Sequence, residues 1–431
     1  MDCLKILDSH LKRNGALLLS LILLISVMVN FTSCIANTPR VQAQDLMGDV
    51  KAKSVEGKKV DDLFINNTAD FTVKLFQKSI DNEKNSLVSP LSVMFALAMT
   101  ANGADGNTLV QIEEVLGNDI SLEDLNQYLY YYANSLPNEE KSKFKIANSI
   151  WFRDDENRLA VEKDFLQKNA DYYDAAIYKA PFDDATLNDI NAWVKTNTDD
   201  MIDKILEEIR DDAVMYLINA IVFDAEWKVI YNESNISEDI FNLGDGTKKT
   251  VDFMRSEESL YLDDGNATGF IKPYYDDKYS FVALLPNEGI SLDSYIESLT
   301  GEALLNTIAN AEPATVNASM PKFSYDFEVK LNEILEDLGM PMAFDPKAAD
   351  FSKMGKSSRG NIFIGDVLHK TFISLDEKGT RAGAVTKVEM RDESAAADLR
   401  FVKLDRPFVY GIIDNSTNLP VFIGTLLNPE K

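Results

Sequence analysis

The most informative segment for function covers residues 373–390, ISLDEKGTRAGAVTKVEM, in which small or apolar residues alternate with mostly polar ones. We call it the alternating segment. From Thr380 onward every second residue is small or apolar, and most of the residues between them are polar. A period of two is typical of a β-strand with one face fit for burial and one for water. Gly379, Gly383 and the nearby alanines have weak strand propensity, which favours a strand that enters a sheet late, past side chains already packed. An ordinary half-buried strand followed by a turn remains the alternative.

The segment adjoins residues 391–398, RDESAAAD, whose polar and small residues are typical of an exposed loop. Helices and strands elsewhere in the chain must position the alternating segment and this loop. Most of the predicted helices come first in the chain, and most of the predicted strands come later. Apolar residues at three-to-four spacing predict helices, and continuous apolar runs predict buried strands. The predicted helices cover residues 64–78, 90–102, 122–133 and 326–339, and the predicted strands cover 214–223, 281–285 and 408–413. Long helices beside long strands indicate an α+β domain.

Histidine and cysteine are too scarce for the usual metal sites. The chain has two histidines, His10 and His369, and two cysteines, Cys3 and Cys34. Because only His369 lies in the predicted domain, a two-histidine metal site is excluded there and a zinc enzyme is disfavoured. A Ser/His/acid triad is also disfavoured for this histidine, which lies in an apolar, strand-flanked stretch. We therefore expect no metal, no cofactor and no enzyme, although a hydrolase built on a carboxylate pair remains an alternative.

The charge of the chain argues against several classes of partner. Its 431 residues carry a formal net charge of -27, with 70 acidic against 43 basic side chains. Such a surface repels phosphate backbones and anionic membranes, so we expect no nucleic-acid partner. With 45% hydrophobic residues the chain is expected to fold around a sizeable core.

The N-terminus is typical of a targeting segment. Basic residues precede an apolar run over residues 16–29, which is too short for a confident membrane span. Small residues then lead to Cys34, as in a bacterial lipoprotein signal. We predict a signal peptide over residues 1–33 with cleavage before Cys34, lipidation of Cys34, and a tether over 34–60. Ordinary secretion or an uncleaved anchor are the alternatives, and all three place the domain outside the cytoplasm.

Residues 61–431 contain no linker or repeat and are predicted to form one domain. Within it, the alternating segment contains Glu377-Lys378-Gly379-Thr380 followed by Ala382-Gly383-Ala384. These residues are similar to the hinge of a reactive-centre loop, and through them the stretch resembles the serpins, a family of protease inhibitors. Further serpin-like motifs occur in the family's order at residues 85–92, 103–104, 219–227, 320–323, 338–340, 344, 350–352, 369–370, 406–410, 422–424 and 428–429.

The resemblance implies a metastable α+β fold of three sheets and about nine helices, with an exposed reactive-centre loop. A serine or cysteine protease attacks that loop, forms an acyl-enzyme, and is trapped when the loop inserts into the main sheet as a new strand. The implied partner is the target protease, in a covalent complex with a monomeric inhibitor. The alternative is a non-inhibitory serpin with a carrier or adhesion role, for which bulky or charged hinge residues are expected instead.

The resemblance also implies roles for single residues. Ser89, Ser92, Asn219 and His369 correspond to the shutter, a polar cluster under the main sheet, and Trp227 corresponds to an aromatic at the breach near the hinge. The family's spacing from Glu377 places the reactive bond between Glu393 and Ser394. Because residues 394–407 form a longer stretch than in many serpins, bonds at 391–392 and 395–397 stay open as alternatives.

Overall fold

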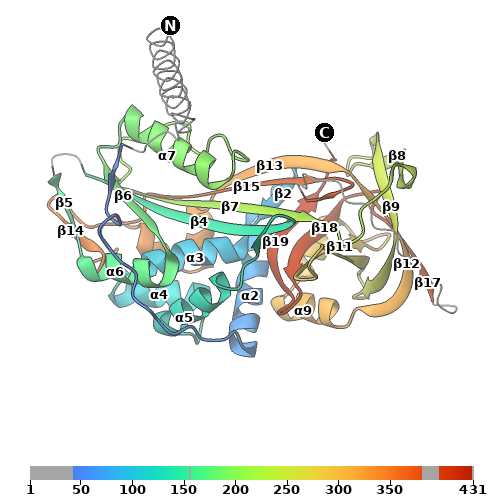
Figure 1. Ribbon diagram of the computed structural model, residues 1–431, viewed down its shortest axis with the longest axis horizontal. Helices are drawn as coiled ribbons and strands as arrows, with labels where there is room; N and C mark the ends of the chain where they lie inside the picture. The colour runs from blue at the N-terminus through green and yellow to red at the C-terminus, as the bar shows by residue number, and fades with distance from the viewer. Residues whose placement is uncertain (1–41, 155–156, 381–397, 430–431) are drawn as a thin grey trace, which may run out of the picture. The chain divides into compact units, whose positions relative to one another are not determined.

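The structure is a computed structural model that describes residues 42–154, 157–380 and 398–429. An eight-stranded main sheet runs across the molecule (Figure 1). Its strands lie in the order β1, β6, β4, β7, β16, β15, β13, and β3 pairs with β4. Their bounds are β1 (Gln44–Asp45), β3 (Asn138–Glu139), β4 (Ser142–Arg153), β6 (Ala176–Ala180), β7 (Met215–Glu226), β13 (Phe323–Lys330), β15 (Asp366–Leu375) and β16 (Gly379–Thr380).

A second sheet has nine strands, and it extends to the right-hand side of the view, where β8, β9, β12 and β17 lie (Figure 1). Its order is β17, β12, β9, β10, β11, β18, β19, β2, with β8 paired to β9, and β5 and β14 form a separate pair. The bounds are β2 (Ser86–Val88), β5 (Leu159–Val161), β8 (Ile236–Asn242), β9 (Lys248–Asp263), β10 (Ala267–Pro273), β11 (Tyr279–Pro286), β12 (Glu312–Pro321), β14 (Gly355–Ser357), β17 (Leu399–Lys403), β18 (Phe408–Asp414) and β19 (Leu419–Leu426).

Within the described residues nine α-helices surround the two sheets. They are α2 (Asp62–Ser79), α3 (Pro90–Ala101), α4 (Gly106–Leu116), α5 (Leu122–Ala133), α6 (Lys163–Tyr173), α7 (Asp184–Asn197), α8 (Leu292–Ser298), α9 (Gly301–Ala309) and α10 (Asn332–Leu338), with short 3-10 turns at Glu233–Asn235 and Pro341–Phe344. Helix α3 begins at Pro90, where the missing N–H is harmless, and all of its residues are buried. It lies under the main sheet, while α7 covers the opposite face (Figure 1).

The predicted α+β class with three sheets and nine helices is confirmed. The predicted strands over 214–223, 281–285 and 408–413 correspond to β7, β11 and β18, whose residues are almost all buried. A strand covered on both faces loses the polar alternation of a surface strand, which is why these segments read as continuous apolar runs.

The predicted helix over 326–339 is wrong in its first half. Residues Phe323–Lys330 form β13, and the helix α10 starts only at Asn332. In FSYDFEVK the apolar residues recur at every second position, which is the period of a strand. The prediction was wrong because the helical spacing of the residues that follow was extended back over this strand. The end of the helix at Gly339 is confirmed, and its φ of 125° lies in the region that favours glycine.

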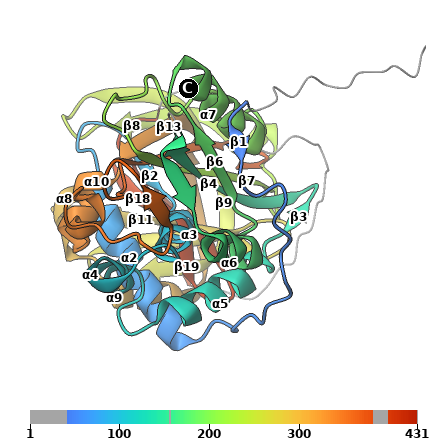
Figure 2. The same cartoon turned by 90° about the vertical axis from the view of Figure 1, so that its left-hand side faces the viewer.

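The predicted tether over 34–60 also needs correction over residues 42–60, which lie along the domain. Strand β1 pairs with β6, and the segment then passes α6 and α5 before α2 (Figure 2). Lys53 N–H donates to Asp171, and Lys58 N–H donates to the carbonyl of Gln127. Scattered apolar residues, Leu46, Met47 and Val60, also pack against the core, but they follow no helical or strand period. Sequence periodicity therefore gave no sign of it.

Asp189 of α7 anchors the start of this segment, and its replacement tests the attachment. One buried carboxylate oxygen accepts from the N–H groups of both Gln42 and Ala43 at 2.7 Å. We expect Asp189→Ala to lose about 2 to 3 kcal/mol of local stability, because hydrogen bonds to a charged acceptor are strong. Amide exchange over residues 42–46 should then rise about 100-fold. Asp189→Asn, which keeps an acceptor oxygen, is the control and should change exchange less; equal exchange in the alanine variant and the parent would contradict the attachment.

Candidate functional site

We call the line along which the neighbouring strands β7 and β15 face each other the seam. The two strands pair directly at one end of the seam, and β16 lies between them at the other end. The two strands pair in parallel over four residues, from Asp366 opposite Tyr216 to His369 opposite Asn219. Beyond His369 no further pairing between them occurs in the described residues. At the far end β16 lies between them instead, with Gly379 opposite Glu226 and Thr380 opposite both Ala225 and Leu375. Gly379 and Thr380, with which the alternation of small and polar residues begins, therefore already lie in the main sheet.

Position 379 admits only glycine without a shift of the backbone. A Cβ atom there would lie 2.0 Å from the carbonyl oxygen of Ala225 and 2.8 Å from the Cα of Glu226. Thr380 is buried, and its hydroxyl is 2.6 Å from that of Tyr274. The small residues that the sequence placed here are thus the ones that let the chain approach β7 closely.

Gly379→Ala is expected to push β16 out of the sheet. The added methyl group has rigid backbone on its far side, so the chain can avoid the clash only by moving away from β7. We expect amide protection at Thr380 to be lost while protection in β4 and β13 is kept. Hydrogen exchange read by mass spectrometry measures both at once. Gly360→Ala provides the comparison, because a Cβ at Gly360 meets no atom within 4 Å, although the positive φ there adds local strain. Unchanged exchange at Thr380 would argue against the close approach.

Trp227 holds the turn that leads into β16. Its backbone N–H donates to the carbonyl of Lys378 at 2.8 Å, and its indole Nε1–H donates to the carbonyl of Asp376 at 2.9 Å. The indole stacks on Tyr274, with 4.5 Å between ring centroids, and Tyr231 N–H donates to the carbonyl of Glu377. Trp227 is buried, and its hydrogen bonds place it beside the turn over residues 376–378.

Glu377 is fixed by a residue that sequence analysis did not single out. Lys322 Nζ lies 2.7 Å from its carboxylate, and this hydrogen bond holds the pKa of Glu377 below its usual value. Lys322 was quoted within the 320–323 motif, but its partner is 55 residues away. Tyr274 and Tyr231 were also missed. No short-range pattern marks such residues, because only the fold brings them to the turn.

The four predicted shutter residues form one buried network. Ser89 N–H donates to His369 Nε2 at 3.1 Å, so the imidazole proton must be on Nδ1, which donates to Asn219 Oδ1 at 2.7 Å. The Asn219 amide donates to the carbonyl and the hydroxyl of Ser92 and to Asn148. Ser89 hydroxyl donates to the carbonyl of Val421. Every polar group of the imidazole and of the Asn219 amide therefore has a partner.

His369 is neutral in this network. It is fully buried, and burial lowers its pKa to about 3. Its Nδ1 faces an amide rather than a carboxylate, and neither serine hydroxyl bonds to its ring, so the geometry is not that of a nucleophilic triad. The pair His369 and Asn219 is also the last paired position before β7 and β15 part. The network thus lies at the point where the seam opens.

Other predicted site residues lie outside the described residues. These are Ala382, Gly383, Ala384, Glu393, Ser394 and Cys34. In the part of the chain that the structure describes, no group of three or more His, Cys, Asp or Glu side chains could hold a metal ion. No helix within those residues is long and apolar enough to cross a membrane.

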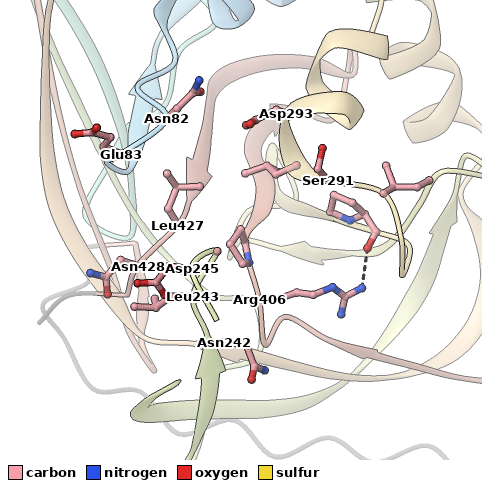
Figure 3. A pocket seen from close by; sticks show the side chains of 15 residues that line it. Asn82, Glu83, Asn242, Leu243, Asp245, Ser291, Asp293, Arg406, Leu427 and Asn428 are labelled. Carbon is pink, nitrogen blue, oxygen red and sulfur yellow. Dashed lines mark hydrogen bonds between the residues drawn. The ribbon is translucent and has the colours of Figure 1, made fainter. Parts of the chain in front are cut away.

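A polar cavity of about 680 Å³ lies away from the seam (Figure 3). It is bordered by the turn after β8, the start of α8 and the ends of β11 and β19. Arg406 lines it, with its guanidinium donating to the carbonyl of Pro286 at 2.7 Å. Glu83, Asp245 and Asp293 also line it, but none of the hinge or network residues does. The cavity therefore has no part in the candidate site.

Comparison with known proteins gives the class. The sequence model of the serpin (serine protease inhibitor) family matches residues 66–429. The chain is 29% identical over 376 residues to an uncharacterized serpin-like protein of Thermococcus kodakarensis, covering 85% of this chain and 86% of that protein. It is 28% identical to human neuroserpin over 381 residues, covering 84% of this chain and 91% of neuroserpin. The chain therefore belongs to the serpin (serine protease inhibitor) family, and it is not an enzyme.

Solved structures agree with this class. A crystal structure of a thermophilic serpin, tengpin, in the native state is 57% identical, with a TM-score of 0.87 over 90% of this chain and 100% of that chain. Tengpin in the latent state is also 57% identical but reaches a TM-score of only 0.78, over 87% of this chain and 100% of that chain. At equal identity, the chain is therefore more similar in structure to native than to latent tengpin.

Proposed function

We propose that this chain is a suicide-substrate inhibitor of a serine or cysteine endopeptidase. The protease cleaves the reactive-centre loop, and the loop then enters the main sheet between β7 and β15 and carries the acyl-enzyme with it. The observation that carries the proposal is β16, which pairs with β7 through both of its residues and with β15 through Thr380 at one end of the seam. Insertion then extends a strand that has begun, in the manner of β-strand addition.

The seam supports this step energetically. Beyond His369 the facing edges of β7 and β15 carry no mutual pairing in the described residues, so an entering strand gains backbone hydrogen bonds there. Entry also separates Asn219 from His369, which makes their network the barrier that keeps the seam closed. The small inward residues Ala382 and Ala384 follow Thr380 in the sequence and fit the same space.

We assign the reactive bond to Glu393 and Ser394, which makes a glutamyl-specific protease the first target to test. The test incubates the purified chain with glutamyl-specific, trypsin-like, elastase-like, subtilisin-like and papain-like proteases. Denaturing gels and mass spectrometry of the released C-terminal peptide are the readouts. We expect a denaturant-stable complex with the glutamyl-specific enzyme and a peptide that starts at Ser394.

Other outcomes are equally informative. A complex with a different protease moves the reactive bond to the position that the peptide gives, and leaves inhibition in place. Clean cleavage by all five enzymes, with no complex and no rise in thermal stability, would overturn the inhibitor proposal. The carrier or adhesion role would then be the better reading of the fold.

We also propose that the chain is exported and held at the cell surface by a lipid on Cys34, and that it acts as a monomer. The basic residues and the apolar run over 16–29 support export. Metabolic labelling with a palmitate analogue tests the anchor, with Cys34→Ala as the unlabelled control. Label that persists in this variant would contradict the assignment.

A further inference from the structure

Strand β17 exposes an apolar pair at the edge of the second sheet. Phe401 is 73% exposed, more than any other large hydrophobic residue described, and Leu399 is 52% exposed. The two are separated by one residue and so lie on the same face of the strand, whereas Val402 points into the core. β17 pairs with β12 on one side only, as the last strand of the sheet. We call Leu399 and Phe401 the β17 surface.

Charged residues lie beside this surface along the strand. Lys403, on the same face, lies 2.9 Å from Asp239, and Arg400, on the opposite face, lies 2.6 Å from Asp398. Across the strand Phe401 faces Asn317, which is exposed and polar. An apolar pair with a polar rim is the arrangement found at the centre of protein interfaces. An edge strand with exposed large hydrophobics is also an aggregation liability that proteins normally avoid, so its presence here calls for a partner.

The position of the surface in the chain identifies that partner. Phe401 follows Ser394, the second residue of the assigned reactive bond, by seven positions. Seven residues span at most about 25 Å when fully extended. A protease domain of roughly 220 residues has a radius of gyration of about 17 Å. A protease attacking the bond therefore has its own surface within reach of β17.

We infer that the β17 surface is a secondary recognition site for the target protease, which docks an apolar patch on Leu399 and Phe401 while its active site engages the loop. This inference rests on the proposed inhibitory function and adds a determinant of its specificity. Docking lowers the free energy of the encounter complex and leaves the later insertion step unchanged, because β17 is not in the main sheet.

The test compares Phe401→Ser with the parent chain against the five proteases named above, of which the glutamyl-specific enzyme is the primary probe. We expect the second-order rate constant for complex formation to fall at least tenfold. The stoichiometry of inhibition should be unchanged, since it reports insertion. Phe401→Leu, which keeps an apolar side chain, should recover most of the rate. Val110→Ser removes a 47% exposed hydrophobic residue from α4 and should leave the rate unaltered.

Several results would overturn the inference. One is complex formation by Phe401→Ser at the parent's rate, and another is an equal loss in Val110→Ser. A parent chain that dimerises through this surface, with Phe401→Ser monomeric and equally fast, would make it a self-association face. If no protease forms a complex, the rate of loop cleavage separates the two proposals: slower cleavage in Phe401→Ser keeps the docking surface although inhibition fails, and equal cleavage rejects both.

Discussion

Replacing Thr380 by arginine is expected to turn the chain from an inhibitor into a substrate of its target protease. Thr380 is buried in β16, with its hydroxyl 2.6 Å from that of Tyr274. A guanidinium there has no acidic partner among the groups that contact Thr380, and burying an unpaired charge costs several kcal/mol. Arginine at 380 is therefore expected to hold β16 out of the sheet, so that insertion has to bury the charge. Each 1.4 kcal/mol added to the insertion barrier slows that step tenfold. Hydrolysis of the acyl-enzyme then overtakes insertion.

The measurement is the stoichiometry of inhibition together with the yield of covalent complex on denaturing gels. We expect the yield to fall more than tenfold, while loop cleavage continues. Arg381→Glu is the matched control, because Arg381 is one of the residues between the small or apolar positions, on the face expected to meet water, where either charge should be tolerated. Full inhibition by Thr380→Arg would remove the main support for insertion at this seam.

Acid is expected to destabilise the fold through His369 as the pH falls below 6.5. Burial lowers the pKa of His369 to about 3, while its value in the unfolded chain is near 6.5. Below pH 6.5 the unfolded state takes up a proton that the native state does not bind, so stability is lost as the pH falls. From pH 6.5 to about pH 4.5 the free energy of unfolding should fall by about 2 kcal/mol from this group.

Comparison with His369→Gln isolates this contribution. The network around His369 consists of Ser89, Ser92, Asn148 and Asn219, none of which titrates in this range. We therefore expect the variant to be less stable overall but to show a flatter pH dependence across this window. Urea unfolding at both pH values measures the slope. A slope as steep in the variant as in the parent would assign the acid sensitivity to other groups.

The hinge is an example of a feature that the local sequence could predict. Glycine at 379 and small residues at alternate positions were visible in the sequence, because steric fit in a sheet restricts residue type at each position. The buried strands β7 and β18 and the helix α3 were visible for the same reason, as apolar runs or apolar spacing. The strand β13 was missed where two periods overlapped. The segment 42–60 was missed because hydrogen bonds donated by its own main-chain N–H groups leave no pattern in its side chains.

The sequence by itself determined the class of fold, the position of the hinge and the residue types of the buried network. Only the tertiary structure decided that His369 faces Asn219 and Ser89, that Lys322 pairs with Glu377, and that β16 already lies in the seam. These partners lie 55 to 280 residues apart, so no local pattern encodes their meeting. Side-chain periodicity reports the environment of each residue, whereas the identity of its neighbour depends on how distant strands are brought into register.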